Sequence, residues 1–320
     1  MKTNKMILSL SVLFLAGALT FTGCRKREKK QAEEPDTETG TASDNATAES
    51  TSEDIVSMGS EAAESGTLTQ YRGNGADGVT GFLSIAPCAT VSGFGTSTIT
   101  VNFGTVGCVG SDGRTRTGKL FYDLSGCTPS TSVYYRNPGF KMVVTSQNYV
   151  VDQNAITINS KTIQNNTPTS IGSGTPTIGN VNLTWHVTSN ITIVKPSGGG
   201  TITWTCDRTK ELTNTNTAAD NCYHGQTLPI DWSKAKIKLN GSASGVNAKG
   251  ENYTATATNL VREFTCTPST VYPKRHPFIS GTINYVPGSR PARLFDYGSG
   301  GCDLNATVVV NGVTYAITLP

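Results

Sequence analysis

The sequence has little of what most enzymes use for chemistry. It holds three histidines among 320 residues, at His186, His224 and His276, each in an unrelated context. It contains neither a Gly-x-Ser-x-Gly nor a His-Glu-x-x-His pattern, which are typical of serine hydrolases and zinc proteases. It also contains no Cys-x-x-Cys pair and no cluster of histidines, which argues against a zinc site. We therefore expect a protein that is not an enzyme and needs no cofactor or metal.

The chain also lacks an apolar run long enough to span a bilayer, which takes roughly 20 apolar residues as a helix. The one candidate extends from Met6 to Phe21 and is interrupted by two serines, a glycine and a threonine. Lys2 and Lys5 precede it, and small residues follow it, which is the layout of a secretory signal peptide. Residues 1–23 are predicted to be that signal.

The stretch "FTGC" at residues 21–24 resembles the lipobox of bacterial lipoproteins, in which the signal is cut before the cysteine and the thiol is acylated. Acyl chains contribute about 0.8 kcal/mol per buried methylene, so several chains on Cys24 would anchor the protein stably. Arg25 stands where lipoproteins retained at the inner membrane of enteric bacteria carry Asp, so the resemblance implies anchoring at the outer membrane. The alternative is ordinary secretory cleavage with an incidental Cys24.

Residues 25–54 contain no aromatic and no branched aliphatic side chain. Such a segment cannot bury enough apolar surface to offset the entropy of ordering it. Residues 24–70 are therefore predicted to be a disordered tether behind the acylated cysteine. A short helix of two or three turns is expected to begin near Ser52, with Ile55, Val56 and Ala63 as its apolar residues.

Charge is divided unevenly along the chain. Residues 25–66 hold eleven acidic and five basic residues, whereas residues 71–320 hold twelve acidic and nineteen basic ones. A basic excess is typical either of a merely soluble surface or of a protein that binds polyanions. For an exported protein, acidic glycans or lipid head groups are the expected polyanions, and nucleic acid is not.

Residues 71–320 lack a convincing amphipathic helix, and their apolar residues alternate with polar ones as in half-buried strands. Examples are "STITVNF", "VNLTWHV" and "TITWTC". Asn311-Gly312 supplies the two positive-φ positions of a type I′ hairpin turn. The pattern predicts one all-β domain of about twelve strands, an antiparallel meander forming a sandwich or a partly open barrel. Two sandwiches that meet near residues 172–179 are the alternative.

Seven further cysteines are expected to form disulfides in an oxidising compartment, with one left over. "TVNFGTVGC" at residues 100–108 aligns without a gap with "LFDYGSGGC" at residues 294–302, and each copy has another cysteine upstream. The echo favours Cys88–Cys108 and Cys266–Cys302. Cys206 is expected to pair with Cys222 across a polar loop, which leaves Cys127 as the free thiol. The rival scheme joins Cys108 to Cys302.

The stretch "ITVNFGTVGCVGSDGRTRTGKL", the tail "FDYGSGGCDLNATVVVNGVTYAITL" and the lipobox together resemble a family of poorly characterised lipoproteins of Bacteroidota-type bacteria. The chain departs from the family pattern at Asn102, where the family has Asp, and at Ser299, where an acid is expected. The resemblance implies an envelope address and a β-rich fold, and it implies no activity.

"GRTRTGKL" comes close to a phosphate-binding loop, but Leu120 stands where Ser or Thr would hold magnesium, and a strand-like segment follows instead of a helix. Nucleotide binding is therefore not expected. Asp112-Gly113 is interpreted as a turn that leads into a strand whose Arg114, Arg116 and Lys119 face solvent or an anion.

Three further candidates for chemistry remain. Loop carboxylates, first Asp207 with Glu211 and then Asp296 with Asp303, would suit a glycan hydrolase, but such carboxylates usually cap turns. Asp296 and Asp303, with Asn305, are a weak calcium candidate. The loop "YHGQTLPIDW" around Trp232 is the first place to expect a binding surface.

The sequence favours a lipid-anchored, non-enzymatic binding or structural module of the cell envelope. Its first alternative is a lipid or lipoprotein carrier with an apolar cavity, and its second is the glycan hydrolase.

Overall fold

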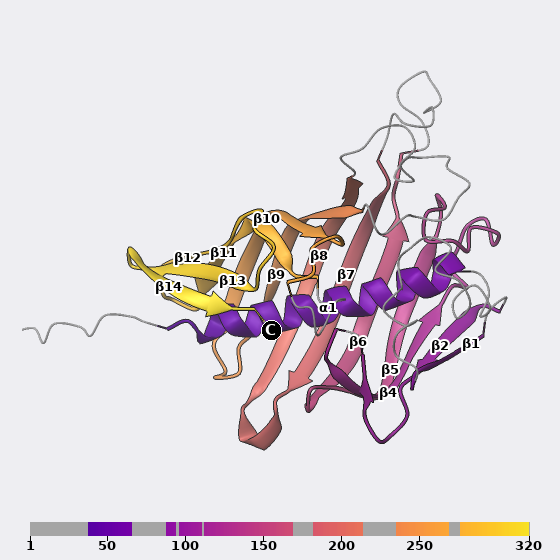
Figure 1. Cartoon of the computed structure of the whole chain (residues 1–320), viewed down its shortest axis with the longest axis horizontal. Helices are drawn as coiled ribbons and strands as arrows, with labels where there is room; N and C mark the ends of the chain where they lie inside the picture. The colour runs from indigo at the N-terminus through magenta and orange to yellow at the C-terminus, as the bar shows by residue number, and fades with distance from the viewer. Residues whose placement is uncertain are drawn as a thin grey trace, which may run out of the picture. The chain divides into compact units, whose positions relative to one another are not determined.

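The computed structural model describes most of the chain after residue 37. The described ranges are 38–65, 88–93, 96–110, 112–168, 182–213, 235–268 and 276–319. All of them belong to one compact unit, Thr37–Pro320. Within them the chain forms a single antiparallel sheet of 14 strands and one α-helix, α1 (Gly40–Ser65) (Figure 1).

The sheet is a meander, because nearly every strand pairs with the next one along the chain. The order is β1-β2-β4 and then consecutive to β14, with the two-residue β3 paired to β4 beside this path. The strands are β1 (Thr90–Ser92), β2 (Thr98–Asn102), β3 (Cys108–Val109), β4 (Thr115–Asp123), β5 (Lys141–Val151), β6 (Asn154–Asn165), β7 (Thr184–Val194), β8 (Thr201–Thr213), β9 (Lys236–Val246), β10 (Asn252–Glu263), β11 (Phe278–Pro287), β12 (Arg293–Ser299), β13 (Asn305–Val310) and β14 (Val313–Thr318).

The predicted all-β antiparallel fold is confirmed, as one open sheet rather than two packed ones. β1 and β14 end the strand order, so the sheet is not closed. The suggested junction at residues 172–179 lies outside the described residues. β6 and β7, which flank it, are paired along ten positions, so the sheet is continuous from one side of it to the other.

Alternation of side chains determines which face each strand buries. In β8, Ile202, Trp204 and Cys206 are buried while the threonines between them are exposed. The Asn311-Gly312 turn also forms as expected, with φ of 50° and 80°, and it joins β13 to β14. These local patterns are sufficient to explain the strands and their hairpins.

The stretch "GRTRTGK" forms the start of β4, with a bulge at Gly118. Gly118 has φ of 84°, and a Cβ there would lie 2.1 Å from the carbonyl oxygen of Asn148 on β5. Only glycine fits this close approach, and a bulge bends its strand. The glycine therefore shapes the sheet and does not cradle a phosphate.

Helix α1 corrects the predicted tether. Residues 24–70 were expected to be disordered with at most a short helix, but residues 40–65 form a helix of about seven turns. The helix runs across the strands (Figure 1), and most of its side chains are buried. The folded unit therefore begins before residue 71.

The prediction failed because α1 is stabilised by partners that lie far away in the sequence. Ile55, Val56 and Met58 are its only apolar side chains larger than alanine. Small residues let it approach the sheet closely: a Cβ on Gly59 would lie 2.5 Å from the ring of Tyr122. Tyr122 in turn donates a hydrogen bond to the carbonyl oxygen of Ile55, 3.1 Å away.

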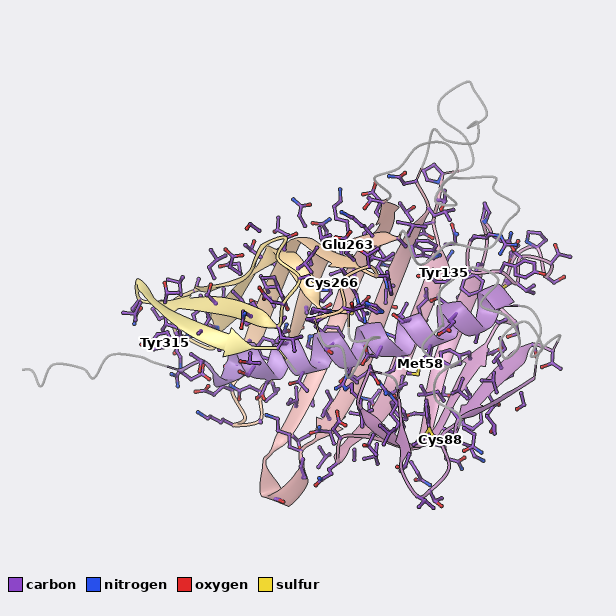
Figure 2. The ribbon with its side chains drawn as sticks, viewed as in Figure 1. Met58, Cys88, Tyr135, Glu263, Cys266 and Tyr315 are labelled. Carbon is purple, nitrogen blue, oxygen red and sulfur yellow. A yellow bond between two sulfur atoms is a disulfide. The ribbon has the colours of Figure 1, made fainter. Side chains whose placement is uncertain are left out.

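Two disulfides hold the two echoed segments. Cys88 is bonded to Cys108 and Cys266 to Cys302, which are the pairs that the echo favoured, and the rival Cys108–Cys302 bond does not form. Figure 2 shows the two bridges in well-separated parts of the sheet. They therefore staple the sheet locally near its two ends.

The expected Cys206–Cys222 disulfide is wrong, since Cys206 is a free thiol. Cys206 follows Trp204 in the inward register of β8, so its side chain is buried against the interior. Cys222 lies outside the described residues. Cys127 is free, as expected, and its sulfur is hydrogen-bonded to the backbone of Lys141.

Candidate binding groove on the inner face of the sheet

Six buried cations lie on the face of the sheet that α1 covers, and we call them the cationic face. They come from five strands, β4, β6, β8, β10 and β12, and each is at most 7% exposed. They are Arg116, Lys161, Arg208, Lys210, Arg262 and Arg293. Charges buried this deeply need counter-charges or hydrogen bonds, since an unpaired buried ion is very costly.

Helix α1 supplies those counter-charges. It has six acidic residues and no Lys or Arg. Glu49 forms a two-pronged ion pair with Arg208, with distances of 2.5 Å from Oε2 to Nη2 and 3.2 Å from Oε1 to Nε. Glu53 bonds Lys210 at 2.7 Å. Both pairs are almost entirely removed from solvent.

Asp54 is shared among three arginines. Its Oδ2 lies 2.5 Å from Arg114 Nη1 and 3.4 Å from Arg116 Nη2, and its Oδ1 lies 3.6 Å from Arg262 Nη2. Asp112, on the turn before β4, completes the cluster through two bonds to Arg116 of 2.6 and 2.9 Å. Asp152 also lies in the cluster, with its Oδ2 3.1 Å from Arg114 Nε, so three carboxylates face three guanidinium groups and the charges balance.

The N-terminal part of α1 is held in the same way. Asp44 forms an ion pair with Lys195, which follows β7, and its other oxygen accepts a 2.7 Å bond from the amide of Ala248. Thr41 Oγ1 accepts a bond from Asn247 Nδ2 at 2.8 Å. Glu38, just before the helix, lies 4.0 Å from Arg293.

Hydrogen bonds to uncharged side chains of α1 add geometric specificity along the helix. The indole of Trp204 donates to Asn45 Oδ1 at 2.9 Å. Lys161 Nζ donates to Ser52 Oγ at 2.6 Å and lies 3.5 Å from Ser189 Oγ. Each turn of α1 from residue 41 to residue 55 therefore has at least one polar contact with the sheet.

The charges shift the pKa values of the helix carboxyls. Burial alone would raise the pKa of Glu53 and of Asp54, but the facing cations outweigh it, Lys210 for Glu53 and Arg114 and Arg116 for Asp54, and hold both values below their usual range. Lys161 behaves differently, since burial lowers its pKa and its nearest partners are hydroxyls. Most cations of the cationic face, which forms the floor of the groove that α1 occupies, therefore pair with carboxylates. Lys161 does not.

Arg114 and Arg116, predicted to face solvent or an anion, face the carboxylate of Asp54 in the same chain. Lys119 lies beyond the bulge, one position before the buried Leu120, and is only half-buried. The basic excess of the body thus serves in large part to hold the acidic α1. The opposite charges of the two parts of the sequence were the signal for this contact, but no motif indicated which residues meet.

The carboxylates considered for hydrolysis have structural partners instead. Asp207 lies on the outer face of β8, 66% exposed and 2.9 Å from His186 Nε2. Glu211 bonds Asn182 and Lys238. Asp296 and Asp303 accept bonds from the backbone amides two residues further on, at 2.8 and 2.7 Å, as turn caps do.

The remaining predicted candidates do not add a site. Trp185 and Trp204 are buried, with Trp185 stacked on Tyr135 at 4.2 Å between ring centroids. Trp232 and His224 lie outside the described residues. Within the described ranges, no group of three His, Cys, Asp or Glu side chains is arranged to hold a metal ion. In the calcium candidate, Asp296 and Asp303 cap turns, and Asn305 donates its backbone amide to Asp303.

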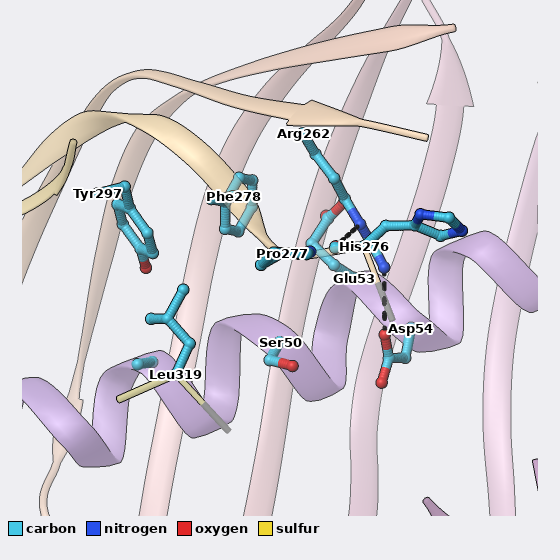
Figure 3. Close-up of a pocket in the computed structure, with 10 residues that line it drawn as sticks. Ser50, Glu53, Asp54, Arg262, His276, Pro277, Phe278, Tyr297 and Leu319 are labelled. Atoms are coloured by element: carbon cyan, nitrogen blue, oxygen red, sulfur yellow. Dashed lines mark hydrogen bonds and ion pairs between the residues drawn. The ribbon is translucent and has the colours of Figure 1, made fainter. Parts of the chain in front are cut away.

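A small hollow of about 40 Å³ lies between α1 and the start of β11 (Figure 3). Ser50, Glu53 and Asp54 line it from the helix, and Arg262 and Phe278 line it from the sheet. Such a volume holds a water molecule or two and no larger ligand. At this point, side chains of α1 and of the sheet therefore fill most of the space between them.

No helix in the described part of the chain is both long and apolar enough to cross a membrane. Comparison of the chain with known protein families, with curated proteins and with solved structures finds no match.

Proposed function

We propose that this chain is a lipid-anchored protein of the cell envelope, held at the outer membrane by acyl chains on Cys24, and that its folded part is a non-enzymatic binding module. The binding site is the cationic face, and its ligands are anionic. The lipobox and the resemblance to envelope lipoproteins support this localisation. The paired cations and carboxylates between α1 and the sheet carry the assignment of the site.

The polar character of this contact is what supports a binding role. A helix kept only for stability would gain more from apolar side chains, since replacing a buried ion pair by well-packed hydrophobic residues is often neutral or stabilising. Here Glu49 and Glu53 pair with Arg208 and Lys210 one by one, and Asp54 is shared among three arginines. This arrangement recognises a particular pattern of negative charge, and α1 is the occupant that the chain itself supplies.

A labelled peptide of residues 38–65, titrated into the full-length chain and followed by fluorescence anisotropy, tests the site. The built-in helix competes with the peptide, so a Glu49→Gln chain, whose own helix is held less strongly, should bind it more tightly than the unaltered chain does. A peptide with Glu49, Glu53 and Asp54 changed to Gln, Gln and Asn is the matched control. Equal binding of both peptides, or of neither, would refute the proposed site.

The anchor is tested separately. Incorporation of a labelled fatty acid should require Cys24 and vanish in Cys24→Ala, and the labelled chain should fractionate with the outer membrane. Label that persists in Cys24→Ala, or no label in either chain, would refute the anchor.

The carrier remains a second candidate, and the open sheet wrapped over one helix favours it. Next to the cations, the inner face carries apolar side chains, among them Ile156, Ile163, Trp204 and Leu239, which would line a groove if α1 left. Binding of a fluorescent lipid that increases in Glu49→Gln would favour this candidate, and lipid binding that is absent from both chains would exclude it.

A further inference from the structure

We infer that α1 of one copy docks into the groove of a second copy, so that two copies pair by exchanging helices. This rests on the proposed role of the cationic face as a helix-binding site. The occupant is a second copy of this chain, because α1 is the one segment whose fit to the groove the structure displays. The identical segment from a neighbour makes the identical contacts, so exchange loses none of them.

Helix α1 needs the cations of a sheet for its stability, but that sheet can belong to either copy of the chain. Its acidic side chains have no cation within the helix, and Glu49 and Glu53 are spaced i, i+4, where like charges repel. In proteins, most of the stability of a helix comes from tertiary packing rather than from the helix alone. The cations that neutralise these acids lie on the sheet, on residues such as Arg208 and Lys210 that are more than 150 positions away.

The contact is also suited to opening. Only Ile55, Val56 and Met58 add apolar area beyond alanine, while Asp44, Glu49, Glu53 and Asp54 regain water when the helix leaves. On the sheet side the cations regain water as well, which recovers part of their desolvation cost. The helix and the cations of the sheet are therefore compatible with water when they separate, while apolar side chains of the sheet such as Trp204 and Leu239 favour docking of a helix again.

The length of the chain permits the exchange. In the sequence, 24 residues separate Ser65 from Thr90, the first residue of β1, and such a length spans at most about 80 Å when extended. Gly40 lies 16 positions after Cys24. Copies anchored through Cys24 in one membrane would therefore hold each α1 close to neighbouring grooves, at a high effective concentration.

Zero-length cross-linking of isotope-labelled chains tests the exchange directly. Light and heavy full-length chains are mixed, incubated and treated with a carbodiimide, which joins a carboxylate to an amine that contacts it. Asp44 and Lys195 form the reporter, since Lys195 is about 30% exposed and its ammonium group forms an ion pair with Asp44 of the docked α1. Exchange predicts cross-linked peptides with one light and one heavy member, in a fraction that rises with incubation time.

Lys236 and Glu263 are the matched control. They lie 3.2 Å apart on the paired strands β9 and β10, with exposures similar to that of Lys195, and neither belongs to α1. Their cross-link should stay purely light or purely heavy. The reporter should disappear in Lys195→Arg, which keeps the charge and removes the amine, while the control should persist.

Glu49→Gln should accelerate the appearance of mixed light and heavy Asp44–Lys195 cross-links, because it weakens the ion pair that holds α1 on Arg208. A reporter that stays unmixed in both the unaltered and the Glu49→Gln chains, while the control cross-link forms, overturns the exchange. Mixing at the reporter and the control alike also overturns it, since random association would explain both. Peptide binding without mixing refutes the exchange and leaves the proposed site intact.

Discussion

Glu49 of α1 and Arg208 of β8 are 159 positions apart in the sequence and form a two-pronged ion pair in which each side chain is only 1% exposed. Glu49→Ala leaves the guanidinium of Arg208 buried without its carboxylate. Losing one member of a buried pair typically costs about 3–5 kcal/mol. Urea denaturation of Glu49→Ala should show a loss of this order in the free energy of unfolding.

Two comparisons make this measurement specific. The double variant Glu49→Leu with Arg208→Met removes both charges, and it should recover most of the stability that Glu49→Ala loses. Glu211→Ala removes one member of a partly exposed pair with Lys238, and surface pairs of this kind contribute about 1 kcal/mol or less. An equal loss in Glu49→Ala and Glu211→Ala would contradict a special role for the buried pair.

Lys161 and Lys210 offer a matched pair of lysines on the same face. Burial lowers the pKa of Lys161, whose partners are the hydroxyls of Ser52 and Ser189, so its charge opposes folding at neutral pH. This cost fades as pH rises toward the ordinary lysine value of 10.5. Lys161→Met should therefore keep or raise the melting temperature, whereas Lys210→Met should lower it by stranding Glu53. The reverse order would refute this account of the two sites.

Acid should release α1. The pKa values of Glu53 and Asp54 are lowered in the folded chain, so their contribution to stability is complete above their ordinary values of 4.5 and 3.8 and is lost as pH falls further. The fluorescence of Trp204, whose indole donates to Asn45 on α1, reports the release. The difference spectrum between the unaltered chain and Trp204→Phe should change below about pH 4. A signal that changes only with global unfolding would contradict separate release.

The two free thiols among the described residues can report the same opening through their rates of alkylation. Cys206 and Cys127 are 8% and 6% exposed, but only Cys206 lies close enough to Glu49 and Glu53 of α1 to feel their charges. In Glu49→Gln, alkylation of Cys206 should speed up by about tenfold for each 1.4 kcal/mol by which docking is weakened. Alkylation of Cys127, mapped by mass spectrometry in the same sample, should keep its rate. Equal acceleration at both thiols would indicate general loosening instead.

Much of the sheet could be predicted from the sequence, because strands follow from local alternation and turn residues. The strand "TITWTC" in β8 and the Asn311-Gly312 hairpin follow from their local sequence alone. The similarity of the segments that end at Cys108 and Cys302 led to the two correct disulfides. Cys206 shows the limit of this approach. Its pairing was inferred from a loop, whereas its inward register on β8 decides the outcome.

Helix α1 could not be predicted locally, because its stability lies in contacts with residues that follow it by 60 to more than 200 positions, such as Arg114 and Asn247. The composition of residues 25–54 correctly shows that little apolar area is available. It does not show that the sheet carries buried cations that pair with the acidic residues of α1. The stretch that resembled a phosphate-binding loop contains Arg114 and Arg116, which both contact the carboxylate of Asp54. The anion that these arginines bind is therefore a side chain of the same protein.

Hydrogen exchange of the α1 amides, measured in the full-length chain by mass spectrometry, tests the central claim most directly. If α1 is a reversible occupant of the groove, residues 40–63 should open as one unit, at a lower free energy than β7 and β8. Glu49→Gln should lower that free energy further without changing the protection of the strands. Exchange of α1 only together with β7 and β8, at one common free energy, would show that the helix is a permanent part of the core.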